Sequence, residues 1–166
     1  NPDKFLTDYY VGQKVGEIWG YVTEGFFSSD AEIAAHADQS LYRSHSSGKI
    51  QVGDIMLKDL NGDGKVNPGL NTATDPGDRR VIGNTTPHYT YGISLGSNYR
   101  SIFLNGFFQG VAKQDWYPSP ESNAFWGQYN RPYGLVPSWQ LKPGMIWSKE
   151  NPNSFLPRYA SRLSNN

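Results

Sequence analysis

The 166-residue sequence contains no cysteine, which excludes disulfide bonds and thiolate metal sites. It also lacks any apolar run of about 18 residues, which excludes a transmembrane helix. Charged residues make up only 18% of the chain, and 15 basic side chains balance 15 acidic ones. A nucleic-acid-binding protein needs a basic face, and a surface membrane anchor needs a polybasic segment, so the balance argues against both classes.

Sequence signatures of catalysis are also missing. The chain has no G-x-S-x-G motif, no glycine-rich phosphate loop and no H-E-x-x-H motif. The three histidines, His36, His45 and His88, lack the paired spacing of metal ligands, and no sequence rule pairs two carboxylates for glycosidase chemistry. We therefore expect a protein that is not an enzyme.

Aromatic residues, glycine and proline are abundant instead. Aromatics make up 14% of the chain, with eleven Tyr and five Trp, and there are 18 Gly and 11 Pro. Such a composition is typical of short strands joined by long loops, with a surface suited to contacts. The sequence predicts an all-β protein with a single short helix at about 30–38, where Ser29 and Glu32 form a capping box before an alanine-rich run. From Val111 onward the pattern becomes a long, aromatic-rich segment broken by prolines.

Residues 89–110 alternate with a period of two and predict a hairpin whose turn lies near 98–101. One face is apolar and carries Tyr91, Ile93, Leu95, Tyr99, Ile102, Leu104 and Phe108. The other face carries Thr90, Gly92, Ser94, Gly96 and Asn98 in the first strand and Phe103, Asn105, Phe107 and Gln109 in the second. Each strand has roughly 10 residues, the length that crosses a bilayer at a tilt, and tyrosines at the strand ends match an interfacial girdle. We therefore expect an antiparallel transmembrane β-barrel segment, although a soluble sandwich would show the same alternation.

The run Asp59-Leu60-Asn61-Gly62-Asp63-Gly64 matches the start of a calcium loop. Asp59, Asn61 and Asp63 offer side-chain oxygens at alternate positions, and Lys65 offers its carbonyl. The twelfth position is Leu70 instead of Glu, so Asp78 is the closest candidate for the closing ligand, with Asp75 as a weaker one. The sequence thus predicts a structural Ca²⁺ site. Two other readings are a turn without an ion, and ion pairs between Asp78 and the adjacent arginines, Arg79 and Arg80.

The aromatic segment supplies the second candidate site. Flat rings stack on the apolar faces of sugars while neighbouring polar groups bind hydroxyls. The predicted ligand-binding residues are Trp116, Tyr117, Trp126, Tyr129, Arg131 and Tyr133. The competing interpretation is that these rings pack the loops against one another.

Several stretches, in order, resemble one protein family. They are the glycine-rich segment 15–27, Gly53-Asp54-Ile55 followed by the 59–66 run, Asp78-Arg79 with 81–84 and Pro87, Tyr91-Gly92 with 107–110, the segment 125–132, and Trp147 with 157–159. The family is the SusC/RagA-like TonB-linked outer-membrane proteins of Bacteroidetes-type bacteria.

The resemblance implies a segment, residues 1–166, of a 22-stranded TonB-dependent receptor β-barrel in the cell outer membrane, without the plug domain or the final strands. It also implies import of glycans or oligosaccharides, a SusD-like surface lipoprotein as lid, energy from TonB, and contact with membrane lipid. The alternatives are a soluble secreted module, either carbohydrate-binding or a calcium-stapled adhesion module, and a peptide importer on the same barrel.

Overall fold

The computed structural model describes residues 4–42, 49–119, 122–129 and 135–159. Within these residues, six strands form three separate two-stranded antiparallel sheets, β1 with β4, β2 with β3, and β5 with β6. Two α-helices and two 3₁₀ turns are short and lie between them. The described part is mostly strand and loop, as expected for an all-β protein, and it contains no closed barrel.

The glycine-rich segment 15–27, predicted as one extended run, forms two strands with different partners. β1 (Glu17–Tyr21) pairs with β4 (Arg79–Asn84), and β2 (Thr23–Phe26) pairs with β3 (Ile55–Leu57). Both pairings are irregular, with a register shift in each. The shifts add local twist, which lets one short segment serve two sheets.

The predicted helix exists but is shorter than expected. α1 runs from Asp30 to Ala35, and the Ser29 hydroxyl accepts the Glu32 N–H, so the predicted N-cap is confirmed. The predicted end near residue 38 is wrong, because the Asp38 backbone instead bridges to Lys65 and hydrogen-bonds on both sides of it, to Gly64 and Val66. A 3₁₀ turn, η1 (Ser40–Tyr42), follows.

The expectation of a single helix is also wrong. α2 (Asn123–Trp126) runs directly into a second 3₁₀ turn, η2 (Gly127–Tyr129). The Gln140 amide donates to the carbonyls of Phe125 and Trp126 and so satisfies acceptors at the end of this short helix. No helix among the described residues has the length and apolarity required to cross a membrane.

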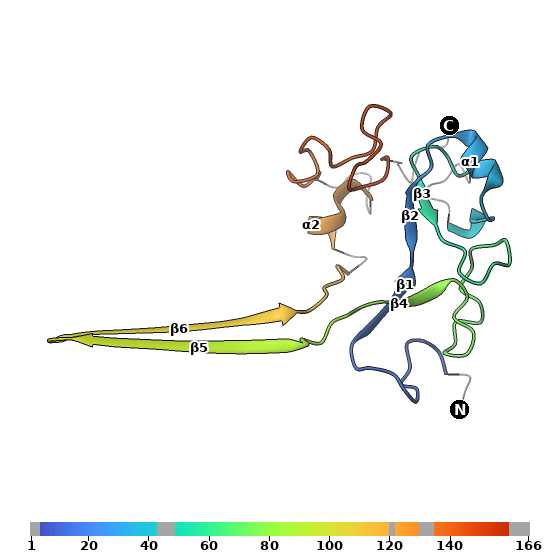
Figure 1. The fold of residues 1–166 in the computed structure, drawn as a ribbon. Helices are drawn as coiled ribbons and strands as arrows, with labels where there is room; N and C mark the ends of the chain where they lie inside the picture. The colour runs from blue at the N-terminus through green and yellow to red at the C-terminus, as the bar shows by residue number, and fades with distance from the viewer. Residues whose placement is uncertain (1–3, 43–48, 120–121, 130–134, 160–166) are drawn as a thin grey trace.

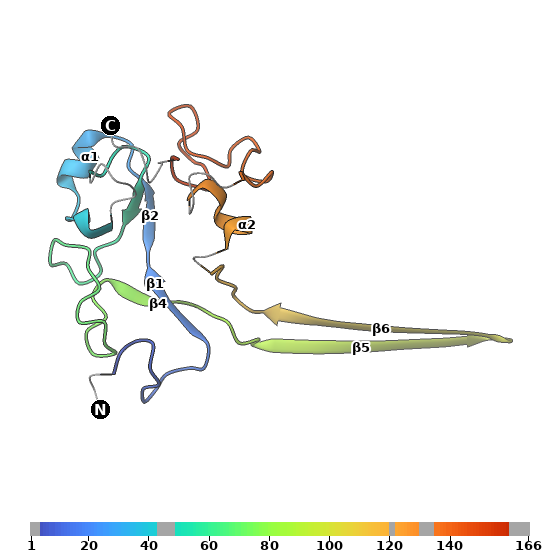
Figure 2. The ribbon, with the colours of Figure 1, turned by 180° about the vertical axis from the view of Figure 1, so that it is seen from behind.

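β5 (Tyr89–Tyr99) and β6 (Ile102–Lys113) form the predicted hairpin, which extends away from the remaining elements as a long ribbon (Figures 1 and 2). The turn is tight: Tyr99 pairs with Ile102, and Arg100 has a left-handed φ of 53°. Ile93 lies opposite Phe108, and Gly92 lies opposite Gln109, so the two predicted faces are confirmed. No other described element packs on this sheet.

The remaining elements form two lobes (Figure 1). The first lobe holds β1 to β4 and α1, within residues 4–88, and the second holds α2, η2 and the loop 135–159. Only four hydrophobic side chains are buried in the described residues, Leu6, Phe27, Val66 and Leu156, and only Phe27 and Val66 are fully so.

Polar side chains that are buried join separate segments of the chain through hydrogen bonds. The Gln39 amide donates to the Ile55 carbonyl and accepts the Leu57 N–H, so it pairs with β3 as another strand would. Asn84, at the end of β4, pairs through its backbone with Asp115 just after β6, and its own N–H donates to an Asp115 carboxylate oxygen. These bonds fix the base of the hairpin to the first lobe.

Candidate functional site

An aromatic cleft of about 540 Å³ lies between the two lobes. Its walls are Thr23, Gly25, Phe26, Ile55, Phe125, Trp126, Tyr129, Phe155, Leu156 and Pro157. The volume is within the range of small-molecule sites, and the lining is predominantly apolar, as such sites commonly are. The cleft brings together segments that are about 100 residues apart in the chain.

The second lobe is held against the first by the end of the described chain. Arg158 forms an ion pair with Asp54 at 2.7 Å, and its backbone N–H donates to the Gly53 carbonyl. The Asp54 side chain is almost fully buried. Breaking a buried ion pair by removing one partner costs about 3–5 kcal/mol, so this contact is a strong clamp behind the cleft.

Two of the predicted ligand-binding residues line the cleft. The Trp126 indole N–H donates to the Ser119 carbonyl, and the Tyr129 hydroxyl donates to the Pro157 carbonyl. Burial raises the pKa of Tyr129 to about 12, with a further contribution from Tyr159, so the phenol stays protonated at neutral pH. Both rings are therefore fixed in position by hydrogen bonds to the loops.

The other predicted aromatic residues are placed differently. Trp116 and Tyr117 are exposed and do not line the cleft, and Trp116 meets Phe125 edge to face at 5.8 Å. Arg131 and Tyr133 lie outside the described residues. The rings of Phe125, Trp126 and Trp139 also pack on one another. Loop packing and an accessible cleft thus coexist in the same cluster.

Sequence reasoning missed the opposite wall of the cleft. Phe26 and Ile55 come from the sheet of β2 and β3, and Leu156 and Pro157 come from the loop that Arg158 clamps. The only sequence signal for them was the presence of apolar residues beside glycines and prolines, which does not specify a partner.

The acidic loop is folded by its own backbone. Both carboxylate oxygens of Asp59 accept N–H groups, from Gly62 at 2.6 Å and Gly64 at 2.9 Å. Asn61 and Asp63 accept the N–H groups two residues further on. Burial alone would raise the pKa of Asp59, but the bonds from Gly64 and Gly62 lower it below its usual value.

Asp78 closes this loop as a hydrogen-bond acceptor. It is fully buried, and its carboxylate accepts the backbone N–H groups of Leu60, Asn61 and Asn67. The interpretation that Asp78 pairs with an adjacent arginine is wrong for Arg79, whose guanidinium donates to the Pro68 carbonyl and the Asn71 side chain instead.

The donor set of this loop is compatible with Ca²⁺, which takes oxygen ligands, because carboxylate oxygens keep lone pairs beyond one N–H bond. No group of three or more His, Cys, Asp or Glu side chains in the described residues gathers as a metal site, however. The backbone bonds alone are enough to hold the turn, so a bound ion stays a prediction.

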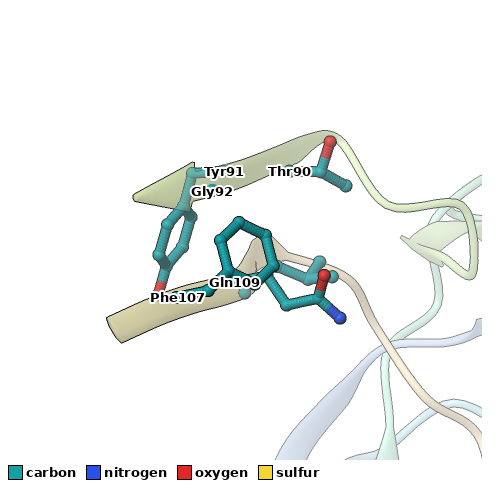
Figure 3. Close-up of a pocket in the computed structure, with 7 residues that line it drawn as sticks. Thr90, Tyr91, Gly92, Phe107 and Gln109 are labelled. Carbon is teal, nitrogen blue, oxygen red and sulfur yellow. The ribbon is translucent and has the colours of Figure 1, made fainter. Parts of the chain in front are cut away.

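The hairpin carries a shallow hollow near its base, lined by residues that include Thr90, Tyr91, Gly92, Phe107 and Gln109 (Figure 3). Aromatic rings lie over glycines here: a Cβ on Gly92 would lie 3.3 Å from the Phe107 ring, and the Tyr91 ring covers Gly110 in the same way. The hollow is open on the ribbon surface, so we assign it to aromatic–glycine packing across the strands.

Comparison with known proteins gives one relative. Over 151 residues, 91% of the chain, the sequence is 24% identical to "TonB-dependent receptor P3" of Formosa agariphila. The matched region spans 13% of that protein, so the chain corresponds to about an eighth of its relative's length. No protein-family model matches the chain, and no solved structure matches it. The chain is thus similar to a segment of a TonB-dependent receptor.

Proposed function

We propose that this chain is part of an outer-membrane TonB-dependent transporter of the SusC/RagA-like type that imports oligosaccharides. The hairpin is the observation that carries the proposal. The face with Ile93, Leu95 and Leu104 is uncovered, with these side chains exposed by 49%, 60% and 71%, while Phe103 and Phe107 lie on the opposite face. An isolated two-stranded ribbon is only marginally stable in water, and both outer edges of this one lack a described partner strand.

Placement in a barrel wall would account for both the uncovered apolar face and the unpaired strand edges. Neighbouring strands would pair with the two edges, lipid would cover the face with Ile93 and Leu95, and water in the lumen would cover the face with Ser94 and Asn105. The alternative of a soluble sandwich requires the apolar face to be sealed against protein, and no described residue seals it.

The cleft supports the oligosaccharide as the substrate class. Aromatic rings with polar groups at their margins suit sugars, which have apolar ring faces and hydroxyl edges. In this scheme the two lobes lie outside the membrane, beneath a SusD-like lipoprotein lid, and TonB acts on the plug elsewhere in the complete protein. The chain contributes binding surface and barrel wall and catalyses no reaction. A Ca²⁺ ion in the acidic loop would have a structural role.

Spin labels on the hairpin test the membrane placement. The chain contains no cysteine, so Ile93→Cys and Ser94→Cys can be labelled in the complete protein once any cysteines elsewhere are replaced. In lipid vesicles, the label at position 93 should be accessible to oxygen and shielded from a water-soluble nickel reagent. The label at position 94 should show the reverse. Low accessibility of position 93 to both reagents would indicate a protein core and would refute the proposal.

Uptake tests the transport function. Cells that express the complete protein with its lid should import labelled oligosaccharide, and removal of TonB should abolish import. Import of peptides without import of oligosaccharides would support a peptide transporter on the same scaffold and would overturn the assignment of substrate.

A further inference from the structure

A second pocket of about 390 Å³ lies on the other side of the β2 edge from the aromatic cleft. It is lined by Glu24, Gly25, Phe26, Ser28, Trp147, Pro152, Asn153 and Ser154. Gly25 and Phe26 line both the cleft and this pocket, so the two are neighbours that share this part of β2. We call it the Trp147 pocket.

Glycine is required at the junction of the two spaces. Gly25 has a φ of +130°, a conformation that side chains rarely adopt, and no atom lies within 4 Å of where its Cβ would be. The space beside the Gly25 backbone, between the two sets of lining residues, is therefore open. A side chain at this position would both strain the strand and enter that space.

The indole of Trp147 forms a fixed wall. Its ring lies against the backbone of Gly53, where an added Cβ would come within 2.4 Å of the ring. Its backbone N–H donates to the Leu156 carbonyl, and the Arg158 clamp follows two residues later. A rigid aromatic wall binds a ligand with little loss of side-chain entropy.

The remaining lining supplies hydrogen-bonding groups of a particular kind. Glu24 is the one charged side chain among the lining residues, and the Asn153 amide makes no hydrogen bond within the described residues. The Glu24 carboxylate lies 3.1 Å from the Lys58 ammonium, at the exposed margin. One carboxylate, one amide and one indole form the combination that holds a sugar ring, because the ring stacks while acceptors and donors meet its hydroxyls.

We propose that the Trp147 pocket is a subsite for one ring of an uncharged oligosaccharide whose next rings occupy the aromatic cleft. The pocket stacks the ring on Trp147, and Glu24 and Asn153 bind its hydroxyls. Sulfated and uronic sugars gain no advantage here, because the Glu24 carboxylate is already paired with Lys58 and the lining offers no excess positive charge to bind an anionic group. This inference rests on the proposed oligosaccharide import and adds the location and the charge preference of the substrate.

The test measures binding by calorimetry with the complete protein and its lid, against panels of neutral and of anionic hexasaccharides. Glu24→Gln and Asn153→Ala change exposed side chains, so both variants should fold. Each should weaken binding of the neutral ligand at least tenfold, which corresponds to the loss of one or two hydrogen bonds. Glu150→Gln is the matched control, because Glu150 is exposed in the same loop, one turn before Asn153, and does not line the pocket.

The possible outcomes distinguish failure of the proposed subsite from failure of the proposed oligosaccharide import. Unchanged affinity for neutral hexasaccharides in both variants overturns the pocket and leaves oligosaccharide import standing. Preferential binding of anionic hexasaccharides by the wild type overturns the charge preference. Failure of the wild type to bind any saccharide, with import of peptides, overturns the proposed function and the subsite together.

Discussion

Arginine substitutions at two adjacent positions of β5 separate the two faces of the hairpin. β5 has 11 residues, which at about 3.4 Å per residue extend about 37 Å. At a tilt of about 45° this length covers about 26 Å of depth, close to the apolar band of outer-membrane barrels. Ile93 and Ser94 are central in the strand, so both would lie near the bilayer midplane.

The expected costs differ because the two side chains point in opposite directions. Ile93→Arg places a charge at the midplane of the lipid face, which costs about 2–4 kcal/mol. It also removes the cross-strand pair with Phe108, for up to about 1 kcal/mol more. Ser94→Arg extends into the hydrated interior and should cost less than about 1 kcal/mol. Tyr99→Arg, at the strand end, should also cost about 0–1 kcal/mol.

The assay is denaturant unfolding of the complete protein from lipid vesicles, followed by tryptophan fluorescence. The order of destabilisation should be Ile93→Arg first, with Ser94→Arg and Tyr99→Arg both close to wild type. A larger cost for Ser94→Arg than for Ile93→Arg would show that the faces are reversed. Equal costs at positions 93 and 99 would refute a dependence on membrane depth, and with it the barrel placement.

Four further predictions concern the first lobe and the clamp. Asp78→Asn should speed hydrogen exchange at the backbone amides of Leu60, Asn61 and Asn67 by about 10- to 100-fold, because each charge-assisted bond contributes about 1.5–3 kcal/mol. The control is Asp63→Asn, which lies at an exposed position and should change the exchange of these amides little. The pKa of Asp59 is lowered in the folded loop, so the Asp59 carboxylate stabilises the loop at neutral pH, and this contribution is lost as the pH falls below the ordinary carboxyl value. Amide hydrogen exchange of the loop, followed during an acid titration, should show this loss in wild type and not in Asp59→Asn. If the loop binds Ca²⁺, the ion should slow exchange of the same amides, and Asp59→Asn should abolish the effect; no response in wild type would refute the ion site. Arg158→Ala should expose the cleft lining to proteolysis, because it leaves Asp54 buried without its ion-pair partner, whereas Arg158→Lys should retain part of the protection.

The similarity to a TonB-dependent receptor and the geometry of the hairpin both support the proposed barrel placement. The relative matches at 24% identity across nearly the whole chain. The hairpin supports this placement through its strand length, its alternation and the lack of a covering element in the described residues. Neither the relative nor the hairpin identifies the substrate, for which we propose the side chains of the cleft and the Trp147 pocket as determinants.

Several features were predictable from sequence because their causes lie within a few residues. The alternation from Tyr89 to Gly110 fixes which side chains share a face, since the period of a strand is two and the tight turn sets the register. The N-cap at Ser29 needs only the Glu32 N–H three residues away. The Asp59 turn is likewise closed by its own glycine N–H groups.

Other features depended on partners that are distant in the chain. The segment 15–27 divides into two strands because β4 and β3 pair with its two halves, and α1 ends at Ala35 because the Asp38 backbone pairs near Lys65. No local propensity records these pairings. The hydrogen-bond partners of Asp78 are likewise distant in the chain: the backbone N–H groups of Leu60, Asn61 and Asn67 converge on its carboxylate, which the sequence did not predict.

The candidate binding surfaces depend on tertiary structure alone. The aromatic composition indicated a contact surface, but Trp126 and Tyr129 line a cleft only because the Arg158–Asp54 clamp brings the second lobe against β2. Trp116 has the same chemistry and lies outside that cleft. Short-range hydrogen bonds and strand periodicity depend on neighbouring residues and can be predicted from them, whereas a cavity depends on which surfaces, distant in the chain, come into contact.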